Sequence, residues 1–377
     1  MKTISDYNFE GKTVLLRSDL NSDVVKNKVL ESERIKESAI TIKELLKKKA
    51  KVVILAHQGN PGKSDFTSLK KHSEYLNKYV KVKFIPKFLS DRSLEEIKRL
   101  KKGEALLLDN VRQSKDEFIV SKNNEILKKL IPLADVYVND AFSVCHRKQT
   151  SIIGIPKHLP SFMGRLLEKE VKALRKININ ETLFILGGAK PEDNIKLLKA
   201  KKILTCGLFG QLCLIANGKD LGAQNKYLEK EKILTKDILK KLKWNKVVTP
   251  IDFAVKVNGE RKELSLDEFP SKYEIFDIGS KTIGMYKKEI RNAKSIYMKG
   301  PAGFCADEKF CKGTNSILKE ISKTKAFSLI GGGHLSDAIA KSKINKKSFN
   351  HISLSGGALL SYVAGEMLPG LEVLKRG

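Results

Sequence analysis

The chain has 377 residues, of which 41% are hydrophobic, and its 72 Lys and Arg against 43 Asp and Glu give a net charge of +29. This length exceeds what one compact core usually holds, and no apolar run approaches the roughly 18 residues that cross a bilayer, so we expect two domains and no membrane span. Without an apolar leader or a Cys-x-x-Cys pair among its five cysteines, the sequence predicts a cytoplasmic protein with neither a disulfide framework nor a zinc site.

The positive charge is spread along lysine-rich helical segments and does not form a tail. A solvated lysine-rich surface is the favoured interpretation, and an anionic small substrate fits the same sign. A nucleic-acid-binding surface stays open as an alternative, because such surfaces neutralise phosphates with Lys and Arg.

In chain order, short apolar strands alternate with amphipathic helices, which is typical of parallel sheets covered on both faces. The strands are predicted at 13–16, 52–56, 82–85, 105–108 and 136–138, and then at 183–186, 203–205, 247–249, 295–298, 327–330 and 349–353. Between the two sets, apolar residues from Phe162 to Leu174 repeat with a helical period, and Ser161 is the predicted N-cap. We therefore predict two doubly wound, Rossmann-like α/β domains, 1–161 and 178–365, joined by a hinge helix at 162–177.

Ligands of such sheets bind at the carboxyl ends of the strands. In the first half these ends carry Arg17-Ser18-Asp19-Leu20-Asn21, then His57-Gln58-Gly59-Asn60, then Arg112, then His146-Arg147. Together these groups predict a basic pocket for a small phosphate or carboxylate, which arginine binds with two parallel hydrogen bonds.

In the second half the strand ends are rich in glycine, as in GGAK at 187–190, KGPAG at 299–303 and GGGH at 331–334. Glycine lets backbone N–H groups approach a phosphate, and Lys190 could supply a point charge, so these loops predict a nucleotide site. A P-loop is excluded because His57 stands where its first glycine would be, and no GxGxxG follows the first strand of either half.

The motifs VLLRSDLN, LAHQGNPGK, LLLDNVR, DVYVNDAFSVCHR, LFILGGAK, DIGSKT, GPAGF, KGT, IGGGH and HISLSGGA follow one another in this order. In them the chain resembles phosphoglycerate kinase, of the archaeal type, along nearly its whole length. The resemblance implies reversible transfer of a phosphoryl group between 1,3-bisphosphoglycerate with ADP and 3-phosphoglycerate with ATP, in glycolysis and gluconeogenesis. It also implies Mg²⁺ bound with the nucleotide, a monomer, no nucleic-acid or membrane partner, and a segment 366–377 that packs on the first domain.

The same resemblance assigns the site residues. The acid substrate would meet Asp19, Asn21, Arg34, His57, Gln58, Gly59, Asn60, Arg112 and Arg147. The nucleotide would meet Lys190, Asn194, Gly207, Pro301, Gly331, Gly332, Gly333 and His334, and no residue is expected to hold a metal by itself. Arg34 and Lys190 would be catalytic, stabilising the transferring phosphoryl group.

Several positions depart from the family pattern. Asn60 stands in place of arginine, Asn194 in place of lysine, Lys299 in place of asparagine, Ala306 in place of glutamate, His334-Leu335 in place of an acidic and hydroxyl pair, and Leu354-Ser355 in place of Thr-Gly. These departures concern nucleotide affinity and metal placement more than the reaction. They leave open an inactive relative that still binds nucleotide.

Overall fold

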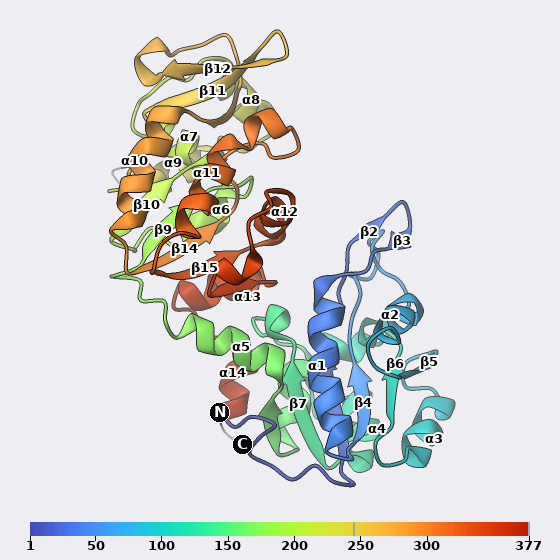
Figure 1. The fold of residues 1–377 in the computed structure, drawn as a ribbon. Helices are drawn as coiled ribbons and strands as arrows, with labels where there is room; N and C mark the ends of the chain where they lie inside the picture. The colour runs from blue at the N-terminus through green and yellow to red at the C-terminus, as the bar shows by residue number, and fades with distance from the viewer. Residues whose placement is uncertain (244–245, 376–377) are drawn as a thin grey trace. The chain divides into compact units, whose positions relative to one another are not determined.

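The protein is represented by a computed structural model, which describes residues 1–243 and 246–375. The chain divides into two compact units, Met1–Lys172 with Glu366–Gly377, and Ala173–Gly365 (Figure 1). Among the described residues, no helix is both long and apolar enough to cross a membrane.

The first unit contains six parallel strands in the order β5-β6-β4-β1-β7-β8. Their bounds are β1 (Thr13–Ser18), β4 (Lys51–Leu55), β5 (Lys83–Ile85), β6 (Ala105–Leu108), β7 (Val136–Asp140) and β8 (Ser161–Met163), with a small hairpin of β2 (Val24–Val25) and β3 (Lys28–Val29). The helices are α1 (Glu33–Lys47), α2 (Lys70–Leu76), α3 (Asp91–Arg99), α4 (Glu125–Leu130) and α14 (Pro369–Glu372).

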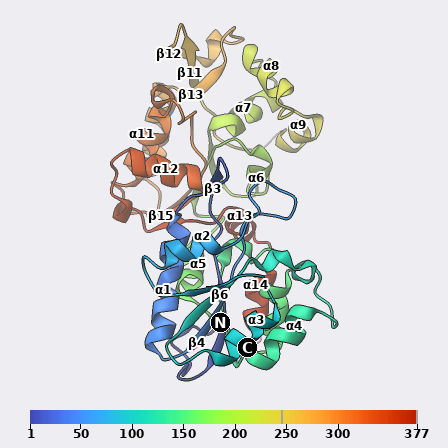
Figure 2. The same cartoon turned by 90° about the vertical axis from the view of Figure 1, so that its right-hand side faces the viewer.

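The apolar runs of β1, β4 and β6 are buried on both faces of this sheet, as parallel strands require. One face packs on α1, whose Ile35, Ala39 and Ile42 recur at helical spacing within the core. Figure 2 shows α1 on one side of the strands and α3 and α4 on the other. Near the end of the chain, the amide of Gly370 donates to the carbonyl of Cys145 (2.9 Å), so α14 belongs to this unit.

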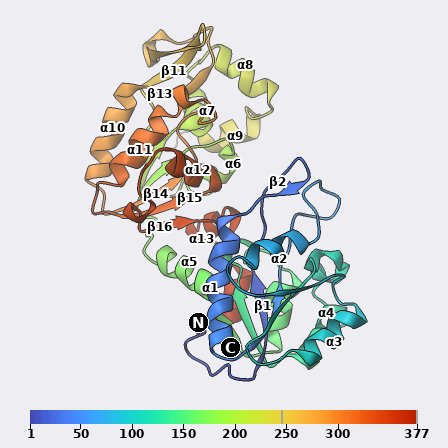
Figure 3. The same ribbon diagram turned by 45° about the vertical axis from the view of Figure 1, so that its right-hand side comes forward.

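The second unit contains five parallel strands in the order β10-β9-β14-β15-β16. The strands are β9 (Leu183–Leu186), β10 (Lys202–Thr205), β14 (Ser295–Lys299), β15 (Phe327–Gly331) and β16 (His351–Ser353). The helices are α6 (Pro191–Ile195), α7 (Gly207–Ala216), α8 (Ala223–Lys230), α9 (Lys236–Leu242), α10 (Ser280–Arg291), α11 (Lys312–Ile321), α12 (Gly333–Lys341) and α13 (Gly357–Val363). Figure 3 shows α10 and α11 on one side of these strands and α6, α7 and α9 on the other. Two doubly wound parallel sheets are therefore confirmed.

One strand prediction in the second unit is wrong. The strand expected at 247–249 is a single isolated bridge between Val248 and Leu204, and Pro250, which has no backbone N–H, follows at once. The sequence analysis also missed an antiparallel sheet, β12-β11-β13, made of β11 (Asp252–Val257), β12 (Glu260–Ser265) and β13 (Ile275–Ile278). Its strands mix polar and apolar residues, so they do not form the continuous apolar runs on which the strand predictions relied.

The predicted hinge helix at 162–177 is wrong at both ends. Phe162 belongs to β8, which pairs with β7 and buries the ring beside Phe9, so Ser161 is not an N-cap. The helix is α5 (Arg165–Leu174), and the division between the two units falls inside it, after Lys172.

The N-terminus of α5 is held by a carboxylate from β7. Asp140 Oδ1 accepts hydrogen bonds from the amides of Leu166 (2.8 Å) and Leu167 (3.1 Å). A Cβ at Gly164 would lie 2.3 Å from the same oxygen, so only glycine allows this approach. The capping group thus comes from a residue distant in sequence.

Burial raises the pKa of Asp140 to about 7, whereas an unfolded aspartate titrates near 4. Between about pH 4 and pH 7, Asp140 is therefore protonated in the folded state and ionised in the unfolded state. Its titration makes the free energy of unfolding smaller as pH rises through this range. Asp140→Asn keeps the hydrogen-bond acceptor but does not titrate. The difference between its unfolding free energy and that of the wild type should therefore grow in favour of the variant by on the order of 1 kcal/mol per pH unit between pH 4 and pH 7. Urea unfolding at pH 4.5, 5.5, 6.5 and 7.5 measures this difference. Parallel stability curves for the two proteins would contradict it.

Candidate active site

At the carboxyl edge of the first sheet, His57 lies beside Arg17 and within the electrostatic influence of three further arginines. Burial lowers the pKa of His57 well below its ordinary value, and Arg17, Arg112, Arg34 and Arg147 lower it further, in that order. The imidazole is therefore neutral at pH 7, while the guanidinium groups keep their charge. The structure thus brings together residues from the ends of β1, β4, β6 and β7 and from α1.

Arg17 lies at the centre of this cation cluster; the strand-end pattern placed it in the predicted basic pocket, although the family resemblance did not list it among the substrate ligands. Its side chain is fully buried, with Nη2 3.1 Å from Nδ1 of His57 and Nε donating to Ser151 Oγ (2.9 Å). Ser151 Oγ in turn donates to Glu117 Oε1 (2.6 Å). Because Arg17 can only donate, Nδ1 of His57 must accept and its proton must sit on Nε2. A charged residue inside the apolar strand VLLRS was the available signal.

Arg112 has hydrogen-bonding capacity that the protein leaves unused. Its side chain is 4% exposed, and Nη1 donates to the carbonyl of Gly59 (2.6 Å) and to Asn60 Oδ1 (2.9 Å). Within the described residues, Nε and Nη2 have no hydrogen-bond partner. Burial, and then Arg17 and Arg147, lower the pKa of Arg112 to about 10, which still leaves it charged at pH 7. Two buried, unpaired N–H groups on a cation mark a place for an anion.

Other predicted residues of this site form hydrogen bonds and ion pairs that hold the strand-end loops in place. Arg34 Nη1 lies 3.1 Å from Asp19 Oδ1, and Asn21 Oδ1 accepts from the amide of Gly59 (2.9 Å). The side chain of Gln58 is fully buried and bonds to protein groups, among them the amide of Ser22 (2.8 Å). A Cβ at Gly59 would lie 2.4 Å from the backbone of Asp65, so this turn needs glycine.

The second unit contains a cavity of about 830 Å³, a volume typical of small-ligand sites. Of the residues predicted to meet a nucleotide, Gly207, Pro301 and His334 line it, whereas Lys190, Asn194 and Gly331–Gly333 lie outside the lining. Ala306, one of the departures from the family pattern, also lines it.

Glycines let the loops at this cavity touch backbone to backbone. Gly207 has φ +54°, and a Cβ there would lie 2.8 Å from the amide nitrogen of Gly188. The amide of Gly188 donates to the carbonyl of Pro301 (2.8 Å). Backbone contacts therefore hold the ends of β9, β10 and β14 together beside the cavity. Gly332, with φ +108°, follows β15 at the N-cap of α12, and a Cβ there would meet nothing within 4 Å.

Other parts of the cavity wall consist of residues that the sequence analysis missed. They include Gln211, Gln224, Tyr227, Phe276, Glu308, Asn315 and Asp337. They lie on helices and on the antiparallel sheet, away from the strand ends, so the rule that led to the other residues could not find them. Apolar rings beside a few amides and carboxylates would suit a flat, partly polar ligand.

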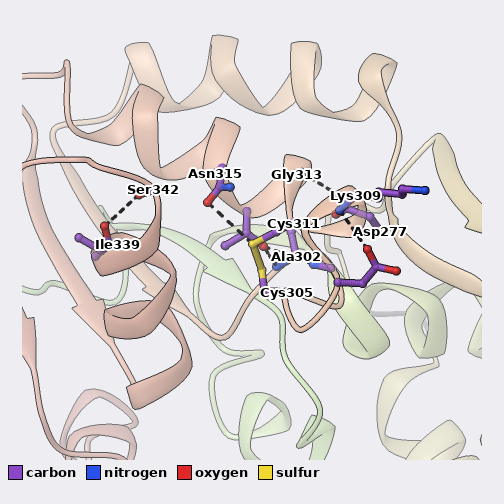
Figure 4. The surroundings of a disulfide bond; sticks show 12 residues. Asp277, Ala302, Cys305, Lys309, Cys311, Gly313, Asn315, Ile339 and Ser342 are labelled. Carbon is purple, nitrogen blue, oxygen red and sulfur yellow. Dashed lines mark hydrogen bonds between the residues drawn. A yellow bond between two sulfur atoms is a disulfide. The ribbon is translucent and has the colours of Figure 1, made fainter. Parts of the chain in front are cut away.

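The expectation of no disulfide is wrong, because Cys305 and Cys311 are bridged, with Cα atoms 4.3 Å apart (Figure 4). A short turn brings the two residues together at a spacing that a search for Cys-x-x-Cys does not detect. The closed loop forms part of the cavity wall, and on its outer side Asp307 pairs with Lys256 (3.0 Å). The remaining cysteines are free and buried, namely Cys145, Cys206 and Cys213.

Unreduced protein unfolded in denaturant should therefore titrate three thiols, and five after treatment with a dithiol. Closing a seven-residue loop stabilises a protein by roughly 2 kcal/mol, so dithiol treatment should lower the unfolding free energy by about that amount. The double variant Cys305→Ser/Cys311→Ser is the control, and dithiol should leave its stability unchanged. Five thiols in the unreduced protein would show that the bridge does not form.

The family model described as phosphoglycerate kinase matches residues 4–366. The phosphoglycerate kinase of Methanothermus fervidus is 39% identical over 99% of this chain and 96% of its own length, and that of Sulfolobus acidocaldarius is 40% identical over 99% and 95%.

The crystal structure of phosphoglycerate kinase from Pyrococcus horikoshii OT3 superposes with a TM-score of 0.89 at 36% identity, covering 100% of this chain and 98% of that one. The structure of phosphoglycerate kinase from Coxiella burnetii gives 0.81 at 28%, covering 99% and 98%. The chain therefore belongs to the phosphoglycerate kinase family, with archaeal relatives, and is a kinase of glycolytic phosphoryl transfer.

Proposed function

We propose that the cation cluster of the first unit binds 3-phosphoglycerate or 1,3-bisphosphoglycerate, and that the cavity of the second unit binds ATP or ADP. The observation that carries the first assignment is Arg112, whose two buried N–H groups lack a partner among the described residues. A phosphate or carboxylate of the acid substrate would accept both in a bidentate contact. Arg147, which is exposed beside the cluster, would bind a further oxygen of the same substrate.

Neutral His57 has a specific task in this proposal. With Nδ1 facing Arg17, its Nε2–H is left to donate to an oxygen of the acid substrate. Since the pKa of His57 lies well below its ordinary value, the charge of the site would stay constant from about pH 6 to pH 8.

The chemistry asks for positioning and charge more than for a nucleophile, because the transferring phosphoryl group passes through a loose transition state. Arg34 would stabilise that group from the side of the acid substrate and Lys190 from the side of the nucleotide. Lys190 is exposed and occupies the N-cap of α6, directly after the glycine loop at 187–188.

Mg²⁺ would enter with the nucleotide. Among the described residues, no group of three or more His, Cys, Asp or Glu is arranged to hold a metal. The residues present fit an ion carried by phosphates and one carboxylate, the common arrangement for Mg²⁺, and Asp337 in the cavity wall would supply that carboxylate. Bound there, the ion would neutralise phosphate charge.

The family assignment also supports a cytoplasmic monomer without nucleic-acid or membrane partners, and we interpret the +29 charge as a solvated surface. Analytical ultracentrifugation and RNA titration at two salt concentrations test this interpretation. A dimer, or RNA binding that falls steeply with salt, would contradict it.

A coupled assay with ATP, 3-phosphoglycerate and Mg²⁺ should show turnover. Lys190→Ala should lower kcat by at least about 100-fold, because a preorganised charge at a transferring group contributes ~3 kcal/mol. Arg34→Ala should lower kcat similarly while leaving nucleotide KM nearly unchanged. Lys196→Ala, at the C-cap of the same short helix, is the matched control and should keep its activity. Folded wild type without turnover would favour an inactive relative, and near-normal kcat in Lys190→Ala would remove that residue from catalysis.

We further propose that α5 is the hinge of a closing motion, since the division between the units falls within it. Small-angle scattering should then give a smaller radius of gyration with both substrates bound than with either alone. An unchanged radius would contradict the hinge.

A further inference from the structure

Two buried glutamines form a hydrogen-bonded pair in the wall of the cavity of the second unit. Gln211 lies on α7 and is 3% exposed, and Gln224 lies on α8 and is 1% exposed. Nε2 of Gln224 donates to Oε1 of Gln211 over 2.8 Å. In a largely apolar cavity, the few polar groups of the wall are the ones that orient and select a ligand.

The direction of this hydrogen bond is fixed by the backbone. The amide nitrogen of Ile275, which begins β13, lies 2.7 Å from Oε1 of Gln224. A backbone N–H can only donate, so this end of the Gln224 side chain must be its oxygen, and the end that faces Gln211 must be its NH2 group. Gln211 must therefore accept through its own oxygen, which turns its NH2 group away from Gln224.

The NH2 group of Gln211 is available to a ligand. Among the described residues, Nε2 of Gln211 has no hydrogen-bond partner, and neighbouring protein atoms do not enclose it. Gln211 lines the cavity one helical turn after Gly207, so the two residues lie on the same face of α7. Because the oxygen of Gln211 is already used, its side chain can offer this ligand hydrogen-bond donors only.

Aromatic rings belong to the same part of the cavity wall. Tyr227 follows Gln224 on α8 by three residues, and Phe276 follows Ile275 on β13, and both rings line the cavity. The ring of Phe276 lies 6.1 Å from that of Phe304, which also lines the cavity and is 55% exposed. Such rings suit a flat heteroaromatic group. A side chain that only donates suits a ring nitrogen or a carbonyl oxygen of that group, and not an amino group.

We propose that Gln211 donates a hydrogen bond to an acceptor atom of the nucleobase, and that Gln224 is a positioning residue that keeps Gln211 in this orientation. The proposal rests on the assignment of the cavity as the nucleotide site, to which it adds a determinant of base specificity. Its ligand class is a nucleoside diphosphate or triphosphate whose base presents a ring nitrogen or a carbonyl oxygen to Gln211.

The test compares ligands that differ in one acceptor atom of the base. Isothermal titration of the full chain is carried out with ADP and with its 1-deaza, 3-deaza and 7-deaza analogues, in each of which a C–H group replaces one ring nitrogen. Wild-type protein should bind one of these analogues about five- to tenfold more weakly than ADP, because a donor of the site is then left unpaired. All four ligands carry the same diphosphate, so the ratio of the two affinities reports on the base alone.

Two substitutions remove the donor in different ways. Gln211→Met should bind ADP about five- to tenfold more weakly than wild type and should bind the weak analogue as tightly as ADP. Gln211→Glu keeps the acceptor for Gln224 and presents an oxygen in place of the NH2 group, so it should also lose the preference for ADP over this analogue. The charge of the glutamate acts on both ligands alike and does not alter their ratio.

Two further variants test the positioning role and the specificity of the effect. Gln224→Met removes only the group that orients Gln211, so it should reduce the preference for ADP over the weak analogue by less than Gln211→Met does. Leu214→Met, three residues further along α7 and outside the cavity lining, is the matched control and should bind both ligands as wild type does.

The proposal is overturned if wild-type protein binds all three analogues as tightly as ADP, or if the weak analogue stays weaker than ADP in both Gln211 variants. An unchanged preference in Gln224→Met would remove the positioning role of Gln224. Wild-type protein that binds none of the four diphosphates would overturn the nucleotide assignment itself. If Gln211→Met does not fold, Gln211→Glu decides the question, since it keeps the hydrogen bond with Gln224.

Discussion

A fully buried guanidinium, that of Arg17, links the end of β1 to His57 after β4 and to Ser151 in the segment after β7. Burying an arginine costs several kcal/mol unless its donors are matched, and here they are matched by a carbonyl, a hydroxyl and an imidazole nitrogen. Burial raises the pKa of Glu117, and Arg17 beside it opposes that rise, so the carboxylate shares in the compensation. This arrangement holds together the segments that follow three strands of the first sheet.

The positive charge of these arginines is compensated only in part, and the uncompensated part is what an anionic ligand would bind. Two buried carboxylates, Asp19 and Glu117, face four arginines, and Arg112 keeps two donors unused within the described structure. A fold selected for stability alone would pair or remove such groups. Their retention is explained if an anionic substrate completes the network, so that relief of the repulsion among the arginines contributes to binding energy.

In the proposed function, the second unit binds phosphate by a different route. Its loops are close enough to share backbone hydrogen bonds, and the glycines at 187–188, 207 and 300 are there because a Cβ would collide with a neighbouring main chain. Lys341 lines the cavity, Lys190 follows the glycines at 187–188, and the loop closed by Cys305 and Cys311 forms part of the cavity wall. Preorganised backbone and a small number of charges are what phosphoryl transfer requires.

Much of this was predictable from the sequence, for a physical reason. Parallel strands present their carboxyl ends on one edge, so the order of strands and loops along the chain was enough to group Asp19, His57, Arg112 and Arg147. The segment at 161–163 could not be assigned in this way, because an apolar pair followed by a helical repeat looks the same whether it extends the helix or pairs with β7. The cavity wall on α7 and α8 depends on tertiary packing, and the disulfide depends on the short turn between Cys305 and Cys311, and neither leaves a local pattern in the sequence.

The central claim is that the two ligand classes bind to different units. Hydrogen exchange followed by mass spectrometry, with each ligand added alone, tests it most directly. The account predicts that 3-phosphoglycerate protects amides at 17–22, 57–60 and 110–113, whereas ADP with Mg²⁺ protects 187–190, 206–211 and 300–311. Protection of the first set by ADP, or of the second set by 3-phosphoglycerate alone, would contradict it.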